Sequence, residues 1–211
     1  MNPIARIAGA MLTALTRGRV LVRGRPGTRC LYLTFDDGPN EQHTPAILDL
    51  LDRHAVKATF FIVGREAQSR PLLVRRLVAS GHELGNHTMI HPRMDLLSDR
   101  GRDIEIDGME CLLERFDGRR SHLFRPPYGG FSLSLLRYCL SNGRRVALWS
   151  RDSMDYTGDL RRVMDSFVRR APQAGDILLF HDDGAVALAA LGELLPRWLA
   201  EGFTFRTLRE A

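Results

Sequence analysis

The chain has 211 residues, of which 44% are hydrophobic and 26% charged, a balance typical of one globular domain and not of a disordered or fibrous protein. Its net charge of +5 comes almost entirely from arginines dispersed among acidic residues, since Lys57 is the only lysine, and this distribution argues against the concentrated basic surface of a nucleic-acid-binding protein. The three cysteines, Cys30, Cys111 and Cys139, are odd in number and far apart, which argues against a disulfide framework or a thiolate metal site and predicts buried free thiols.

Residues 1–25 are predicted to form an amphipathic helix followed by a basic segment. Apolar residues recur at helical spacing from Ile4 to Leu15, and arginines flank and follow them. The stretch lacks the hydrophobic centre and clear cleavage site of a secretory signal, and no segment approaches the roughly 20 apolar residues that span a bilayer. We therefore expect a retained helix that packs on the domain or contacts an anionic membrane peripherally. The expected location is the cytoplasm, at the inner face of the membrane if that contact forms.

Downstream, over residues 28–210, short β-rich runs alternate with longer helical patterns, which predicts an α/β fold of βα units. The predicted strands are 30–35, 57–63, 82–86, 123–126, 144–150, 176–181 and 203–207. The predicted helices are 44–54, 70–80, 99–116, 132–142, 159–171 and 186–201. About seven βα units favour a distorted or incomplete (β/α) barrel over an open sheet.

Polar side chains follow five of the predicted strands, each at the carboxyl end of the strand. These residues are Asp36, Asp37, His87, His91, Arg125, Tyr128, Asp152, Asp155 and His181. Barrel enzymes build their active sites from the loops at this face. The pattern therefore predicts that these side chains meet in one catalytic site.

The adjacent carboxylates of Asp36 and Asp37 are the first sign of metal chemistry. Burying two neighbouring acids at the end of an apolar strand is costly unless a metal cation or an arginine compensates them. His87 and His91 add two imidazoles, although Pro92 biases His91 toward a loop or a final turn. One carboxylate and two imidazoles leave open positions for water and substrate, while the second carboxylate can accept the proton of the water.

Arg125 and His181 complete the predicted hydrolase. Arg125 could hold the second carboxylate ionised and oriented, or it could form an ordinary salt bridge to a loop acid. His181 is a candidate general acid, because protonating a leaving amine needs a group that titrates near neutral pH. The alternative for His181 is a core histidine whose hydrogen bonds are satisfied.

Five motifs in the chain resemble, in order, those of the polysaccharide deacetylases, the NodB-homology family of carbohydrate esterases (family 4). The resemblance covers about residues 28–210 and leaves out the N-terminal helix. The motifs are Thr34-Phe35-Asp36-Asp37-Gly38, His87-Thr88-Met89-Ile90-His91, Arg125-Pro126-Pro127-Tyr128-Gly129, Asp152-Ser153-Met154-Asp155-Tyr156 and Leu179-Phe180-His181-Asp182.

The resemblance implies specific roles around the metal. Asp36 is expected to be the general base, and Asp37, His87 and His91 are expected to bind one divalent ion. Zinc is the expected ion, with cobalt or nickel as alternatives. Arg125 is expected to steady Asp36.

The resemblance also implies roles in binding the substrate and in protonating the leaving amine. The backbone N–H of Tyr128 is expected to contribute to an oxyanion hole, Leu179 to line the acetyl pocket, and Asp155 to orient the acid His181. Tyr156 departs from the family, which usually has a tryptophan as a wall of the sugar groove. This difference bears on substrate preference more than on catalysis.

The function implied is metal-dependent hydrolysis of the N-acetyl group of an aminosugar. The expected substrate is N-acetylglucosamine in an oligosaccharide, a polysaccharide or a lipid-linked glycan, with acetate as the released product. The alternatives are an O-deacetylase of acetylated sugars and a deformylase of a lipid-linked aminosugar. A sugar-binding module with a decayed site is a further alternative, but the sequence keeps every polar position that decay would remove first.

Overall fold

The computed structural model describes residues 11–25, 27 and 29–211. Its centre is a parallel sheet with the strand order β4-β3-β2-β7-β6. Three two-residue strands, β1, β5 and β8, flank this sheet. The strands are β1 (Val20–Leu21), β2 (Cys30–Asp36), β3 (Thr59–Ile62), β4 (Glu83–Asn86), β5 (Val146–Ala147), β6 (Arg151–Asp152), β7 (Ile177–His181) and β8 (Thr204–Phe205).

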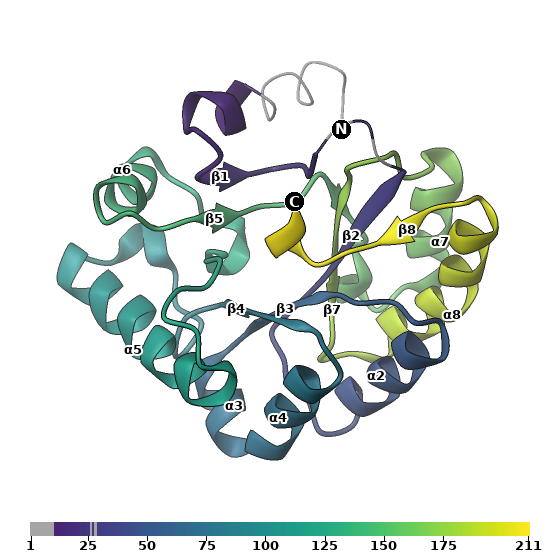
Figure 1. Cartoon of the computed structure of the whole chain (residues 1–211), viewed down its shortest axis with the longest axis horizontal. Helices are drawn as coiled ribbons and strands as arrows, with labels where there is room; N and C mark the ends of the chain where they lie inside the picture. Colours follow the sequence, from purple (N-terminus) through teal and green to yellow (C-terminus); the bar gives the residue numbers. More distant parts are fainter. Residues whose placement is uncertain (1–10, 26, 28) are drawn as a thin grey trace.

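The sheet curves into a distorted barrel, as predicted (Figure 1). Phe124 closes it, because this residue forms parallel bridges both to Asn86 of β4 and to Val146 of β5. From β5 the chain continues through residues 148–150 into β6, which pairs with β7. β1 adds to β5, and β8 adds to the amino end of β2.

Helices cover the outside of the sheet (Figure 1). The helices are α2 (Thr44–Arg53), α3 (Gly64–Ser69), α4 (Pro71–Ala79), α5 (Asp99–Asp117), α6 (Leu133–Ser141), α7 (Leu160–Arg169) and α8 (Ala185–Ala200), with 3-10 turns η1 (Met94–Leu96), η2 (Pro127–Gly129), η3 (Asp155–Thr157) and η4 (Leu208–Glu210). Ser98, Ser132 and Asp159 cap α5, α6 and α7 by accepting a hydrogen bond from the first turn of each helix. Most helices bury an apolar face against strands rich in Phe and Leu, and the rings of Phe35 and Phe60 stack 4.7 Å apart in this core. The helix α6 packs instead on a second cluster that includes Val20, Phe124 and Val146.

The strands differ from the prediction where the chain changes partners. The strand predicted over 123–126 shrinks to Phe124, because Pro126 and Pro127 have no N–H to donate to a ladder. The strand predicted over 144–150 divides into β5 and β6. The N–H of Leu148 donates to Leu21 in β1, whereas the N–H of Ser150 donates to Ile177 in β7. Neither β1 nor the six-residue helix α3 was predicted, since both are too short for a periodic pattern.

The predicted N-terminal helix is described only from residue 11. Residues 4–10, which supply much of its predicted apolar face, lie outside the described residues, and residues 11–15 are helical. Leu12 packs on the cluster that contains Val20 and Val146, whereas Met11 and Leu15 are 57% and 79% exposed. None of the helices in the described part of the chain is long and apolar enough to cross a membrane.

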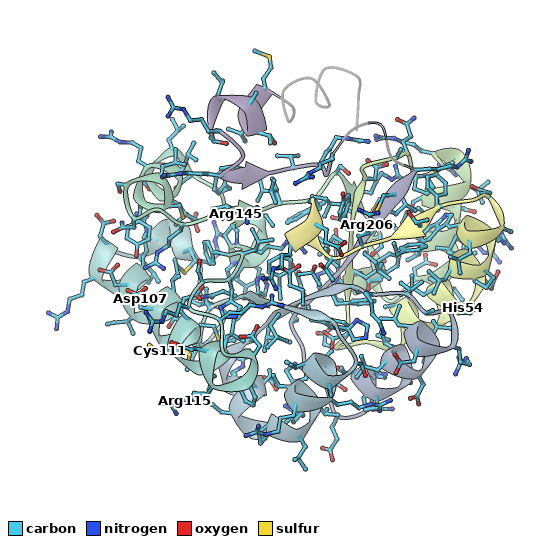
Figure 2. All side chains as sticks on the ribbon, viewed as in Figure 1. His54, Asp107, Cys111, Arg115, Arg145 and Arg206 are labelled. Atoms are coloured by element: carbon cyan, nitrogen blue, oxygen red, sulfur yellow. The ribbon has the colours of Figure 1, made fainter. Side chains whose placement is uncertain are left out.

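The cysteines are only partly as predicted. Cys30 and Cys139 are buried, but the prediction is wrong for Cys111, which is exposed. Asp107, Cys111 and Arg115 follow one another at four-residue spacing along α5 and share its outward face (Figure 2).

Candidate active site

The carboxyl end of β2 delivers the two adjacent acids to different surroundings. Asp36 is the last residue of the strand and is 4% exposed. Asp37 leaves the strand in the left-handed region of backbone space, with φ = 76°, and is half-buried. Gly38 follows, and a Cβ there would lie 2.2 Å from the carboxylate of Asp182, so only glycine fits this turn.

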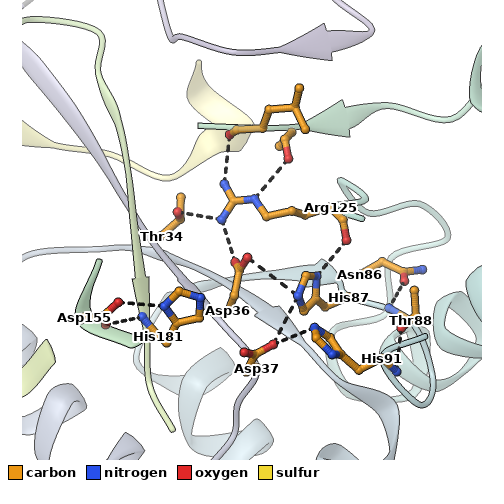
Figure 3. Close-up of polar contacts among 12 residues, drawn as sticks. Thr34, Asp36, Asp37, Asn86, His87, Thr88, His91, Arg125, Asp155 and His181 are labelled. Atoms are coloured by element: carbon orange, nitrogen blue, oxygen red, sulfur yellow. Dashed lines mark hydrogen bonds and ion pairs between the residues drawn. The ribbon is translucent and has the colours of Figure 1, made fainter. Parts of the chain in front are cut away.

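Asp37, His87 and His91 form a set of three ligand atoms that all lie within 4.8 Å of one another. Asp37 Oδ1 is 3.3 Å from His87 Nε2 and 3.0 Å from His91 Nε2 (Figure 3). This oxygen is buried, and it has no hydrogen-bond partner among the described residues. Burial raises the pKa of Asp37, but the two imidazoles outweigh this effect and hold the pKa well below its usual range. An ionised, unpartnered oxygen facing two imidazole nitrogens fits a divalent cation.

The two imidazoles are oriented by the backbone around them. His87 Nδ1 lies 2.8 Å from the carbonyl oxygen of Arg125, which can only accept a hydrogen bond, so Nδ1 carries the proton and Nε2 is free to ligate. His91 has φ = 61°, and its N–H donates to Thr88 Oγ1 at 3.0 Å. Its ring packs on Tyr128 with 4.5 Å between centroids. The predicted loop conformation of His91 before Pro92 is confirmed.

Two residues that the sequence analysis missed hold the loop of residues 87–91 in place. Glu105 Oε2, from α5, accepts hydrogen bonds from the N–H groups of Met89 and Ile90 at 2.9 and 3.0 Å. Asn86 Oδ1 accepts from the N–H of Thr88 at 3.0 Å. The sequence held one signal for Glu105, which is a glutamate on the inward face of a helix predicted from its apolar spacing. A buried carboxylate needs hydrogen-bond partners, so such a residue indicates a polar contact inside the fold.

Arg125 is fully buried and fixed from every side. Its Nη1 donates to Asp36 Oδ1 at 2.6 Å and to Thr34 Oγ1 at 2.9 Å. Its other nitrogens donate to the carbonyl oxygens of Ala147 and Leu148, both at 3.1 Å (Figure 3). Burial lowers the pKa of Arg125, and the Asp36 carboxylate opposes this shift. Arg125 therefore pairs with Asp36 rather than with a loop acid.

One carboxylate oxygen of Asp36 is hydrogen-bonded to Arg125, and the other faces the Asp37–His87–His91 set. Oδ1 accepts from Arg125, whereas Oδ2 lies 3.7 Å from His87 Nε2. A carboxylate with a free oxygen beside three atoms that could hold a metal ion can accept a proton from a water bound there.

His181 stands across the ladder from Asp36, because the two are register partners in the β2–β7 pair. Its Nδ1 lies 2.8 Å from Asp155 Oδ1, and its N–H donates to Asp155 Oδ2 at 2.8 Å. Burial lowers the pKa of His181, but the hydrogen bond and charge of Asp155 outweigh it and raise the pKa to about 9. The pairing with Asp155 thus favours the charged imidazolium, which can donate a proton from Nε2.

These side chains face a cleft of about 370 Å³. It is lined by Asp36, Asp37, His87, His91, Tyr128, Gly129, Trp149, Asp152, Tyr156, Leu179 and His181. All predicted site residues line the cleft except Arg125 and Asp155. Arg125 contacts Asp36, and Asp155 contacts His181, both of which line it. The cleft therefore exposes the Asp36 carboxylate and the His181 imidazole to one space that a substrate can enter.

The aromatic walls include one residue that was not predicted. Tyr156 is exposed at the rim, and its ring is nearly perpendicular to that of His181, with 5.6 Å between centroids. Trp149 lies deeper, against Gly129, where a Cβ would come within 2.8 Å of the indole. No motif marked Trp149, since its role depends on the turn that brings residues 127–129 beside it.

Comparison with known proteins agrees with a hydrolase site of this kind. A family model described as polysaccharide deacetylase matches residues 23–147. A chitooligosaccharide deacetylase of Sinorhizobium fredii is 36% identical over 207 residues, covering 90% of this chain and 95% of that protein. A peptidoglycan-N-acetylglucosamine deacetylase of Bacillus cereus is 34% identical, with 86% and 87% covered.

Solved structures agree in fold. The crystal structure of a peptidoglycan N-acetylglucosamine deacetylase in complex with a benzamide ligand superposes with a TM-score of 0.86 at 29% identity, over 93% of this chain and 94% of that one. A mutant of a family pseudoenzyme, with restored enzymatic activity, superposes with a TM-score of 0.82 at 26% identity, over 90% and 70%. With the five motifs brought together in one cleft and the likeness extending along nearly the whole chain, the chain belongs to the polysaccharide deacetylase family.

Proposed function

We propose that this protein hydrolyses the N-acetyl group of an aminosugar, N-acetylglucosamine by preference, in an oligosaccharide, a polysaccharide or a lipid-linked glycan. The observation that carries this proposal is the meeting of Asp36, the Asp37–His87–His91 ligand set and the Asp155-bound His181 in one cleft. The names of the relatives, which are deacetylases of chitooligosaccharide and peptidoglycan, support the choice of an N-acetylated glycan.

The ligand set is proposed to hold zinc, which accepts mixed oxygen and nitrogen ligands, with cobalt or nickel able to replace it. A divalent cation bound there supplies Lewis acidity, which lowers the pKa of a water and polarises the acetamide carbonyl. The ligand atoms are Asp37 Oδ1, His87 Nε2 and His91 Nε2, each free of any competing strong hydrogen bond to the backbone.

Asp36 and His181 are proposed to move the protons. Asp36 Oδ2 takes the proton of the attacking water, since Oδ1 is held by Arg125. His181 then gives its Nε2 proton to the departing amine, while Asp155 keeps the ring in position through Nδ1. Because the base and the acid stand on neighbouring strands, the proton is taken and given on the two sides of the acetamide carbon.

The remaining cleft residues are proposed to bind the substrate. The backbone N–H of Tyr128 stabilises the oxyanion of the tetrahedral intermediate, and Leu179 contacts the acetyl methyl group. Tyr156 and Trp149 offer aromatic faces to the sugar ring, and Asp152 accepts a hydrogen bond from the N–H of Met154, which orders the loop of residues 152–156.

The test of this function is product analysis with metal-reconstituted protein and tetra-N-acetylchitotetraose. We expect acetate and a free amine in equal amounts. Acetate without amine from an O-acetylated sugar would show the O-deacetylase, and formate from an N-formyl aminosugar the deformylase. Binding of the glycan without any product would support the decayed binding module and contradict the proposal.

The Asp155→Asn variant is expected to lose activity at a lower pH than the wild type. The pKa of His181 is raised chiefly by Asp155, to about 9, so the acid stays charged below that pH and the rate falls as the pH rises through it. Removing the negative charge lowers the pKa and moves the alkaline limb of the kcat profile downward. A divalent cation in the site lowers the pKa in both proteins, so the measured quantity is the shift between them. An alkaline limb that stays in place would contradict the role of Asp155, and the exposed Asp49→Asn is the matched control.

Peripheral membrane contact through the N-terminal segment, from the cytoplasmic side, is part of the same proposal. Met11 and Leu15 are exposed beside Arg17, and basic residues near anionic lipid contribute about 1 kcal/mol each. We expect Met11→Ser/Leu15→Ser to reduce co-sedimentation with anionic liposomes and to spare hydrolysis of soluble substrate. Leu72→Ser, equally exposed on α4, is the control. Equal sedimentation of all three proteins would exclude this contact, and recovery of a shortened protein outside the cytoplasm would indicate a signal peptide.

A further inference from the structure

A basic groove lies beside the active-site cleft, on the other side of the loop of residues 152–156. Its volume is about 470 Å³, and it runs along one face of α7 with Arg151 and Met154 at its side. Asp152 and Tyr156 line the cleft, whereas Met154, between them in sequence, lines the groove. One short loop therefore separates the two.

The groove carries an excess of positive charge. Its charged lining residues are the four arginines Arg151, Arg161, Arg162 and Arg169 and the two aspartates Asp159 and Asp165, a net charge of +2. The three arginines on α7 are exposed, and in the described part of the chain none of their guanidinium groups forms an ion pair or a hydrogen bond. The carboxylate of Asp159 is already used as the helix cap, where it accepts from the N–H of Arg162.

Arg151 adds a buried charge that has no carboxylate at ion-pair distance among the described residues and is opposed only by the more distant Asp176. It is 7% exposed, and its Nη2 donates to the carbonyl oxygens of Ser166 and Arg170 at 3.1 and 2.7 Å. Its Nε has no partner, and no carboxylate among the described residues lies within ion-pair distance of it. A buried guanidinium without a directly paired counterion is costly, and an anion in the adjoining groove would reduce that cost.

The groove and the cleft are electrostatically connected. Asp152 raises the pKa of the Tyr156 hydroxyl, and the charge of Arg162 on the groove side opposes this shift. Arg162 and Arg169 stand seven residues apart on one helix face, about 10 Å along the axis. A charged substituent on a sugar of a glycan bound in the neighbouring cleft fits a groove of that length.

We propose that this groove binds an anionic group, a carboxylate or a phosphate, carried by the glycan whose acetamide occupies the active-site cleft. Guanidinium groups bind both anions with paired hydrogen bonds, and unpaired exposed arginines need not first give up another partner. This inference rests on the proposed deacetylase function and names the class of substrate that the site prefers: an N-acetylated glycan with negative charge near the reacting sugar.

The test compares matched substrates in the wild type and in Arg161→Gln/Arg162→Gln. Tetra-N-acetylchitotetraose is the neutral substrate, and its 1-phosphate is the phosphate arm. A tetrasaccharide of alternating N-acetylglucosamine and N-acetylmuramic acid is the carboxylate arm, with its methyl ester as the uncharged counterpart. In the double variant we expect KM for at least one anionic substrate to rise about tenfold or more, with kcat and the KM of neutral substrates unchanged. Arg53→Gln, exposed on α2, should behave as the wild type.

The outcomes separate this inference from the proposed function. A rise in only one arm identifies the anion as phosphate or carboxylate. Equal KM for charged and neutral substrates in the wild type, or an equal rise for both in the double variant, would overturn the groove assignment while the deacetylase activity stands. If no substrate is turned over, the proposed function fails. In that case, calorimetry measures the affinity of the 1-phosphate for Asp36→Asn and for the same variant with both arginines replaced. Equal affinity of the two proteins would overturn the groove assignment.

Discussion

Replacing Asp36 with asparagine should lower kcat by about a hundredfold to ten-thousandfold while metal binding is kept. The amide has nearly the same shape, and its oxygen can still accept the hydrogen bond from Arg125 Nη1. The nitrogen that replaces the free oxygen cannot take a proton from water. Single-turnover rates on a soluble N-acetylated oligosaccharide, with the metal content measured in the same samples, test the expectation.

The same substitution should also make the fold less stable. Arg125 is fully buried, and its charge is compensated by Asp36. Removing one partner of a buried ion pair typically costs about 3 to 5 kcal/mol. The protein should therefore unfold at a lower temperature than the exposed control Asp49→Asn and still be folded at the assay temperature. A variant that lost the metal but kept appreciable rate when metal was added would mean that Asp36 and Asp37 exchange roles.

Replacing both His87 and His91 with alanine should abolish metal binding and activity together. Asp37 alone would remain of the ligand set, and one carboxylate does not hold a transition metal in competition with water. The loss of rate should exceed that of Asp36→Asn, because the Lewis acid and the oriented water are lost at once. Elemental analysis after dialysis against zinc, cobalt or nickel measures the occupancy directly.

His54→Ala is the matched control for this pair, since His54 lies at the end of α2, away from the cleft. It should keep one metal ion per chain and full activity. Full metal occupancy in the His87→Ala/His91→Ala variant would contradict the ligand assignment, whatever its rate of hydrolysis.

How far the sequence predicts this site depends on the range of the contacts involved. Asp36, Asp37, His87, His91 and His181 could be found because each lies at or shortly after the carboxyl end of a predicted strand, and parallel strands end at one face. Their positions in the fold could therefore be predicted from short motifs, without any knowledge of side-chain contacts.

Other parts of the site depend on contacts between distant segments. Glu105 supports the loop of residues 87–91 from a helix turn that nothing in the local sequence distinguishes, and Trp149 reaches the cleft because Gly129 leaves room for the indole. The strand predicted over 123–126 was wrong in length for a related reason, since the pairing that remains at Phe124 is set by its two neighbours and not by β propensity.

The register of β2 and β7 has a consequence for how such an enzyme can diversify. Asp36 and His181 face each other at one rung of a parallel ladder, so their separation is set by the spacing of two hydrogen-bonded strands, about 4.8 Å between backbones. The loops of residues 127–131 and 152–158 lie outside this ladder, so they can change at positions other than Tyr128 and Asp155 without altering that spacing. The proposed base and acid are thereby placed by the sheet itself, whereas loop residues such as Tyr156 are left to vary with the glycan.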